Sequence, residues 1–188
     1  MTDTSQSRLA PSAAGLSERI AAHTAHISVI GQGYVGLPLA VEFAKAGFTV
    51  TGFDNDPDRV AALGSGRSHV PDVPSEEIQA LLRADRYRPS SSPAPLADSD
   101  VIVICVPTPL RKSKDPDISY VVAAAEESAA RYHPGQLVVL ESTTYPGSTE
   151  ELLLPMFEAR GARIGEDLFV AFSPERIDPG NQIGRAHV

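Results

Sequence analysis

Residues 26–54 read HISVIGQGYVGLPLAVEFAKAGFTVTGFD. The apolar run 27–30 predicts a strand, a glycine-rich turn and a helix follow it, and residues 48–53 predict a second strand that ends at an acidic residue. A strand, a glycine-rich turn, a helix and a second strand make up the first βαβ unit of a dinucleotide-binding sheet. This stretch therefore indicates an α/β fold built on such a unit.

The turn contains three glycines, Gly31, Gly33 and Gly36, at the G-x-G-x-x-G spacing. Gly31 permits the tight turn, Gly33 lets the backbone approach a pyrophosphate, and Gly36 lets the helix pack closely on the strand. The helix start also offers N–H groups and a positive dipole end to phosphates. Asp54 is placed to bind a ribose 2′-hydroxyl and to repel a 2′-phosphate, so we expect NAD rather than NADP. The alternative is a glycine-rich turn of another α/β domain, which the flanking strands, helix and acid disfavour.

The composition is that of a globular protein, with 42% hydrophobic and 21% charged residues among 188. The formal net charge of −8 argues against a nucleic-acid partner or an anionic membrane surface. No run approaches the roughly 18 apolar residues of a membrane span, and we predict no metal site. Cys105 is the only cysteine, which excludes an internal disulfide and favours the reducing cytoplasm.

The chain divides into three predicted regions. Residues 1–25 form a polar N-terminal arm without the pattern of a secretory signal, in which 16–23 form a short helix or stay loose. Residues 26–181 form the NAD-binding domain. Residues 182–188 form a tail that we predict to be non-native.

Helices and strands are predicted to alternate after Asp54. The first helix should bury Val35, Leu39, Phe43 and Ala44 and end at Gly47. Further helices are predicted over 57–63 with Asp56 as N-cap, over about ten residues from 75, over 118–132 with Asp117 as cap, and over 148–160 with Ser148 and Glu151 as a capping box. Further strands are predicted over 87–91, 101–106, 136–141 and 168–172.

This alternation predicts a Rossmann-type, doubly wound parallel sheet with helices on both faces and strand order 3-2-1-4-5-6. Ligands of such sheets bind beyond the carboxyl ends of the strands, so the strand ends near 31–36, 54, 106–109, 141–144 and 173–180 should converge on one crevice. Cys105 lies in a predicted buried strand, where a structural thiol is favoured over a nucleophile. Arg59 could reach the adenine side of the cofactor or be a solvated helix arginine, and both interpretations stay open.

Four strand-end motifs together resemble one family. They are Gly31-Gln-Gly-Tyr-Val-Gly36, Cys105-Val-Pro-Thr-Pro109, Glu141-Ser-Thr-Thr-Tyr-Pro-Gly147 and Phe172-Ser-Pro-Glu-Arg-Ile-Asp-Pro-Gly-Asn181. They resemble the N-terminal half of the nucleotide-sugar 6-dehydrogenases, the UDP-glucose/GDP-mannose dehydrogenase family. The last two motifs are most similar to members acting on UDP-N-acetylglucosamine or UDP-N-acetylmannosamine, with UDP-glucose as the alternative substrate.

The resemblance implies oxidation of a UDP-sugar at C6, from alcohol to carboxylate, with reduction of two NAD, in polysaccharide synthesis. It implies that Thr143 helps place the catalytic water and that Glu175 is an acid/base. It implies a cofactor site at Gly31, Gly33, Tyr34, Val35, Gly36, Asp54, Arg59, Val106, Pro107, Thr108 and Ser142, and a substrate site at Glu175, Arg176, Ile177 and Asp178. The alternatives are turn-forming roles for Ser142 and Thr143 and a solvated loop carboxylate for Glu175.

The chain also departs from the family pattern. In the family, the catalytic cysteine, the oxyanion-stabilising lysine and asparagine, and the central and C-terminal sugar-binding domains follow the motif that ends here at Asn181, and Cys105 matches a strand position instead. We therefore expect a truncated fragment that binds NAD weakly but does not complete the oxidation, because no thioester can form. The full-length form is expected to be a homo-oligomer. A stand-alone dinucleotide-binding module and a dehydrogenase of small hydroxy acids are the competing interpretations; the motif at Ser173 counts against the second.

Overall fold

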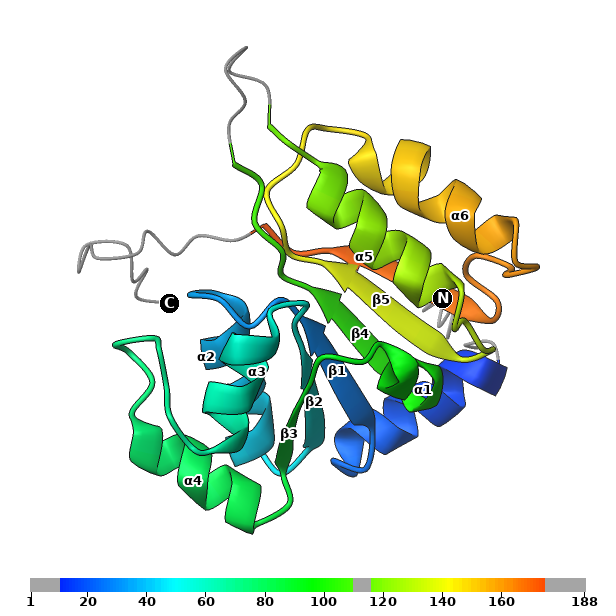
Figure 1. Cartoon of the computed structure of the whole chain (residues 1–188). Helices are drawn as coiled ribbons and strands as arrows, with labels where there is room; N and C mark the ends of the chain where they lie inside the picture. The colour runs from blue at the N-terminus through cyan, green and yellow to red at the C-terminus, as the bar shows by residue number, and fades with distance from the viewer. Residues whose placement is uncertain (1–10, 110–115, 175–188) are drawn as a thin grey trace, which may run out of the picture.

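The computed structural model describes residues 11–109 and 116–174. Six parallel strands form one sheet in the order β3-β2-β1-β4-β5-β6 (Figure 1). The strands are β1 His26–Ile30, β2 Thr49–Phe53, β3 Tyr87–Ser90, β4 Val101–Ile104, β5 Gln136–Leu140 and β6 Leu168–Phe172. The predicted doubly wound sheet and its strand order are confirmed.

Helices cover both faces of the sheet (Figure 1). They are α1 Pro11–Ala21, α2 Gly36–Lys45, α3 Pro57–Gly64, α4 Ser75–Arg83, α5 Ser119–Ala129 and α6 Leu154–Glu158, with a 3₁₀ turn at Ala94–Asp98. Strand β4 shows how the two cores are divided, because successive side chains of a strand point to opposite faces. Val101 and Val103 join the core under α1, α2 and α4, whereas Ile102 and Ile104 join the core under α5 and α6.

The N-terminal region contains a helix that starts earlier than the predicted segment 16–23. Helix α1 buries Leu16 against the sheet, and the Arg19 Nε lies 2.9 Å from the Asp100 Oδ1. Residues 11–21 are therefore part of the packed structure and not a loose arm.

The buried face of α2 also differs from the prediction. Leu37, Ala40 and Val41 are buried together with Ala44, while Val35, Leu39 and Phe43 are only partly buried beside them. The helix is apolar around more than half its circumference, so its sequence period fits two faces. Packing against both the sheet and α4 decides which face is covered.

The predicted N-cap of α3 is confirmed, and the predicted capping box before α6 is wrong. At α3, the Asp56 side chain accepts hydrogen bonds from the N–H groups of Asp58 and Arg59, as an N-cap does. Ser148, by contrast, has helical dihedral angles and donates its hydroxyl to the Tyr145 carbonyl, so no capping box forms. The segment Thr149–Leu153 is π-helical, and Pro155 explains why an α-helix does not run through it: proline has no N–H for the carbonyl four residues earlier.

Candidate functional site

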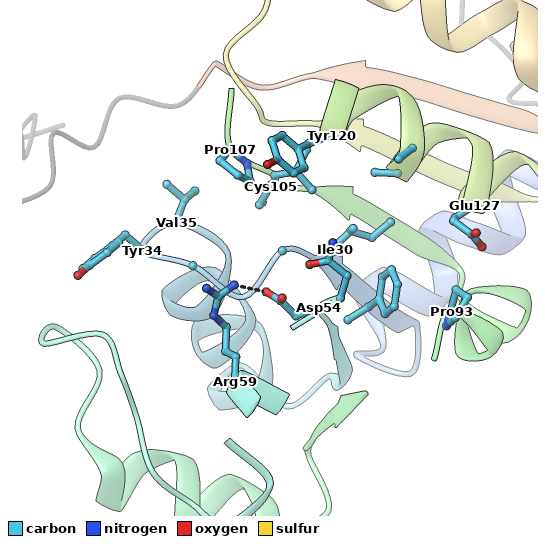
Figure 2. A pocket seen from close by; sticks show the side chains of 17 residues that line it. Ile30, Tyr34, Val35, Asp54, Arg59, Pro93, Cys105, Pro107, Tyr120 and Glu127 are labelled. Atoms are coloured by element: carbon cyan, nitrogen blue, oxygen red, sulfur yellow. Dashed lines mark hydrogen bonds and ion pairs between the residues drawn. The ribbon is translucent and has the colours of Figure 1, made fainter. Parts of the chain in front are cut away.

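A cavity of about 650 Å³ opens beyond the carboxyl ends of β1, β2 and β4 (Figure 2). This is where ligands bind in open parallel sheets. Eight of the predicted cofactor residues line it: Gly31, Gly33, Tyr34, Val35, Asp54, Arg59, Val106 and Pro107. Three distant parts of the sequence therefore meet at one cavity.

Two glycines of the turn are required by the packing of the protein itself. Gly31 has φ +92°, and a Cβ there would lie 2.5 Å from the Cys105 carbonyl oxygen. A Cβ on Gly36 would lie 1.8 Å from the Gly31 carbonyl oxygen and 3.2 Å from the Cys105 Cβ. These contacts let the start of α2 pack against the ends of β1 and β4, as the motif predicts.

Gly33 is different, because nothing in the described structure lies within 4 Å of the position of its Cβ. Its φ is not left-handed, so the backbone conformation does not demand glycine either. Gly33 lines the cavity, and a side chain there would project into open space. Neither the backbone conformation nor the described neighbours account for a glycine at this position, and its lack of a side chain leaves the cavity open next to the backbone.

The turn also presents backbone donors. Within residues 11–109 and 116–174, no acceptor is paired with the N–H groups of Gly33, Tyr34 and Val35, which precede α2. Unpaired N–H groups and the positive dipole end of a ten-residue helix form an anion-binding arrangement. The residues present thus fit the pyrophosphate of a dinucleotide.

Asp54 is buried at the end of β2 and holds several groups together. Its Oδ2 accepts from the Gln32 N–H at 2.8 Å and from the Arg59 Nη1 at 2.8 Å, and its Oδ1 accepts from the Asp56 N–H at 3.0 Å. The Arg59 Nη2 lies 3.6 Å from the Asp56 Oδ2, so one guanidinium sits between two carboxylates. Figure 2 shows Arg59 directed toward Asp54 and not away into solvent, which favours the interpretation of Arg59 as a site residue.

The remaining predicted residues lie elsewhere. Gly36, Thr108 and Ser142 do not line the cavity; the Ser142 hydroxyl donates to the Val106 carbonyl at 2.8 Å and so fixes the end of β4. Thr143 is exposed next to it, also outside the cavity lining. Residues Glu175, Arg176, Ile177 and Asp178 lie outside the described residues. The predicted roles of all these residues toward the cofactor, the substrate and the catalytic water stay predictions.

The far wall of the cavity consists of residues that the sequence motifs did not predict. Tyr120, Ala123, Ala124 and Glu127 of α5 line it, together with Ile30, Phe53, Asn55, Pro93 and Cys105. The four α5 residues follow the i, i+3, i+4, i+7 spacing of one helix face, which was the available signal. Cys105 lies one residue beyond β4 and is buried, as predicted for a structural thiol.

The described residues contain neither a His, Cys, Asp and Glu cluster that could hold a metal ion nor a helix long and apolar enough to cross a bilayer.

Comparisons with known proteins agree with this geometry. Residues 25–186 match the model of the UDP-glucose/GDP-mannose dehydrogenase family, NAD binding domain. The chain is 40% identical over 157 residues to UDP-N-acetyl-D-glucosamine 6-dehydrogenase of Pseudomonas aeruginosa, covering 83% of this chain and 36% of that protein. It is 36% identical over 156 residues to UDP-N-acetyl-D-mannosamine dehydrogenase of Pyrococcus horikoshii, covering 82% of this chain and 37% of that one.

Solved structures give the same result. The structure of the Pyrococcus horikoshii UDP-D-ManNAc dehydrogenase superposes with a TM-score of 0.77 at 36% identity, over 82% of this chain and 37% of that chain. An NDP-N-acetyl-D-galactosaminuronic acid dehydrogenase from Methanosarcina mazei superposes with a TM-score of 0.82 at 31% identity, over 92% and 38%. The chain thus spans little more than a third of the length of these relatives. It belongs to the UDP-glucose/GDP-mannose dehydrogenase family, of which it carries the NAD-binding domain.

Proposed function

We propose that the cavity binds NAD with its pyrophosphate over Gly33 and its adenosine ribose at Asp54 and Arg59. The observation that carries this proposal is the open space at the Cβ position of Gly33, beside three backbone N–H groups that lack an acceptor in the described chain. NAD supplies the hydride acceptor of the reaction, and these residues bind and orient it.

The electrostatics at the ribose end support NAD over NADP. Asp54 and Asp56 together carry one more negative charge than Arg59 neutralises, so a 2′-phosphate would meet net repulsion. The Asp54 Oδ1 accepts one hydrogen bond from the described residues, and a carboxylate oxygen can accept a second one from a ribose hydroxyl.

For the whole protein, we propose NAD-dependent oxidation of a UDP-N-acetylhexosamine at C6 to the uronate, for polysaccharide synthesis. The names of the two relatives at 40% and 36% identity support this substrate class. Thr143 is proposed to place the catalytic water and Glu175 to act as acid/base, since both follow strands that end on the cavity side of the sheet. Ser142 and Thr108 are proposed to contact the cofactor, and Arg176, Ile177 and Asp178 the nucleotide sugar.

The proposal for the whole protein includes a cytoplasmic homo-oligomer without a nucleic-acid or membrane partner. Within these 188 residues, the single cysteine supports the compartment, and the net charge of −8 supports the absence of a nucleic-acid partner.

The decisive experiment is calorimetric titration of the 188-residue chain with NAD and NADP, compared with Gly33→Ala. The added methyl group meets no atom of the described residues, so the thermal midpoint should stay the same, whereas the affinity for NAD should fall by at least ~10-fold, about 1.4 kcal/mol. The matched control is Gly15→Ala in α1, which should bind NAD normally. Absence of NAD binding by the unaltered chain, or unchanged binding by Gly33→Ala, would refute the proposal.

A further inference from the structure

A buried series of hydrogen bonds, from Tyr87 through Gln32, lies next to the glycine turn. The Tyr87 hydroxyl, from β3, donates to the Gln32 Oε1 at 2.7 Å. The Gln32 Nε2 donates in turn to the carbonyls of Val29 at 2.9 Å and Gly31 at 3.3 Å. Gln32 is completely buried and Tyr87 is 1% exposed, so solvent does not take part in these bonds.

Strand β2, which lies between β3 and β1, leaves room for these hydrogen bonds. A Cβ on Gly52 of β2 would lie 2.4 Å from the Gln32 Oε1 and 2.6 Å from the Tyr87 hydroxyl oxygen. Glycine weakens the interior of a strand, and its presence there often marks the close approach of another group. The hydrogen bond from β3 to the turn therefore requires three residues at once, two polar and one without a side chain.

An apolar side chain could fill the volume of Gln32 without burying polar atoms. Burying an amide is unfavourable unless each of its polar atoms is bonded, and here each one is. Burial and the charge of Asp54 raise the pKa of Tyr87, so its hydroxyl remains a donor at physiological pH. Tyr87 and Gln32 thus attach the glycine-rich turn to β3, and their buried polar atoms are all hydrogen-bonded.

We infer that Tyr87 and Gln32 are positioning residues that fix the orientation of the turn toward the pyrophosphate of NAD. Gln32 lies between Gly31 and Gly33 and is held at both ends, by Tyr87 through its side chain and by Asp54 through its N–H. Glycines leave a turn wide conformational freedom. Holding the residue between them keeps the adjacent Gly33 N–H directed at the ligand and lowers the cost of ordering the turn on binding. This inference rests on the proposed binding of NAD.

The test is Tyr87→Phe, which keeps the ring and removes the hydroxyl. Affinity should fall about 10-fold for NAD and for ADP-ribose, because both place a pyrophosphate on the turn. Affinity for adenosine, which has no phosphate, should stay within about twofold when measured by NMR titration. A purely structural role would weaken all three ligands together.

Three further variants complete the test. Gln32→Leu removes the acceptor, and Gln32→Leu combined with Tyr87→Phe should bind NAD no more weakly than Gln32→Leu alone, because both act through one hydrogen bond. Tyr132→Phe is the matched control: its hydroxyl donates to the Asp167 Oδ1 at 2.7 Å at the opposite end of the sheet, so NAD affinity should not change.

The outcomes separate the inference from the proposed function. If the unaltered chain does not bind NAD, the proposed function fails. If the unaltered chain binds NAD and Tyr87→Phe binds NAD equally well, the inference alone is overturned. It is also overturned if Tyr87→Phe lowers the affinity for adenosine by the same factor as the affinity for NAD.

Discussion

The three glycines of one motif do different physical work. Gly31 and Gly36 are held by contacts inside the protein, whereas Gly33 faces open space in the cavity. Substitution of the first pair should therefore cost stability, and substitution of Gly33 should cost ligand binding.

At Gly36, we expect Gly36→Ala to lower the free energy of unfolding by about 2–3 kcal/mol, since the added Cβ overlaps the Gly31 carbonyl oxygen and the backbone must move. Urea denaturation followed by circular dichroism measures this change. Gly15→Ala, within α1 and with its nearest atom at 3.6 Å, should be neutral or slightly stabilising. Equal stability of Gly36→Ala and the unaltered chain would contradict the close packing of α2.

At the scale of elements, the buried carboxylate of Asp167 connects the residue before β6 to the segment that follows α5. The Asp167 Oδ1 accepts from the Tyr132 hydroxyl and from the Arg163 N–H, each at 2.7 Å. The hydrogen bond from Tyr132 and those from Arg163 lower the pKa of Asp167. Desolvation, together with the hydrogen bond to Asp167, raises the pKa of Tyr132 to about 12.

A pH dependence follows from Asp167. Because its pKa is lower in the folded state than in the unfolded state, its stabilising effect is present at neutral pH and is lost as the pH falls below about 4. Asp167→Asn should therefore lower the thermal midpoint at neutral pH and approach the unaltered chain in acid. Glu166→Gln, whose partner Arg163 is mostly exposed, should follow the unaltered chain at each pH. A constant difference between Asp167→Asn and the unaltered chain from neutral pH to pH ~3 would contradict this assignment.

The elements also show what the sequence can predict. Strands and helix starts follow from local signals, such as the apolar run at 101–104 and the N-cap at Asp56, because these depend on near neighbours. The strand order follows from the alternation of strands and helices, because right-handed crossovers restrict it. The covered face of α2 and the cavity face of α5 do not, because distant elements decide which side of a helix is buried.

The same distinction holds for the site. The motif spacing predicts the position of Gly33 and Asp54 at the cavity, but not that Gln32 turns inward to Tyr87. That contact joins residues 55 positions apart, and no spacing rule within one βαβ unit reports it.

At the scale of the molecule, the cavity and the ion pair that holds α1 lie at opposite ends of the parallel strands. The cavity lies at the carboxyl ends, while α1 is joined by Arg19 to Asp100, which immediately precedes β4. Helix α1 lies before residue 25, where the family match begins.

Leu16→Ala tests this separation. Loss of a side chain that is 5% exposed should cost about 2–4 kcal/mol of unfolding free energy. NAD affinity, measured by calorimetry at a temperature where the variant is folded, should be unchanged. Ser17→Ala on the exposed side of α1 serves as the control for stability. A large loss of affinity in Leu16→Ala would show that the two ends of the sheet are coupled.

The Gln32–Tyr87 hydrogen bond makes the glycine motif depend on residues that lie outside it. In the pattern G-x-G-x-x-G, position 32 is written as an unspecified letter, yet it shares one buried hydrogen bond with Tyr87 and one narrow space with Gly52. A homologue with an apolar residue at the first x would have no use for the hydroxyl or for the missing side chain. The three positions should therefore change as a set during evolution, so that a single substitution harmful in this background is harmless in another.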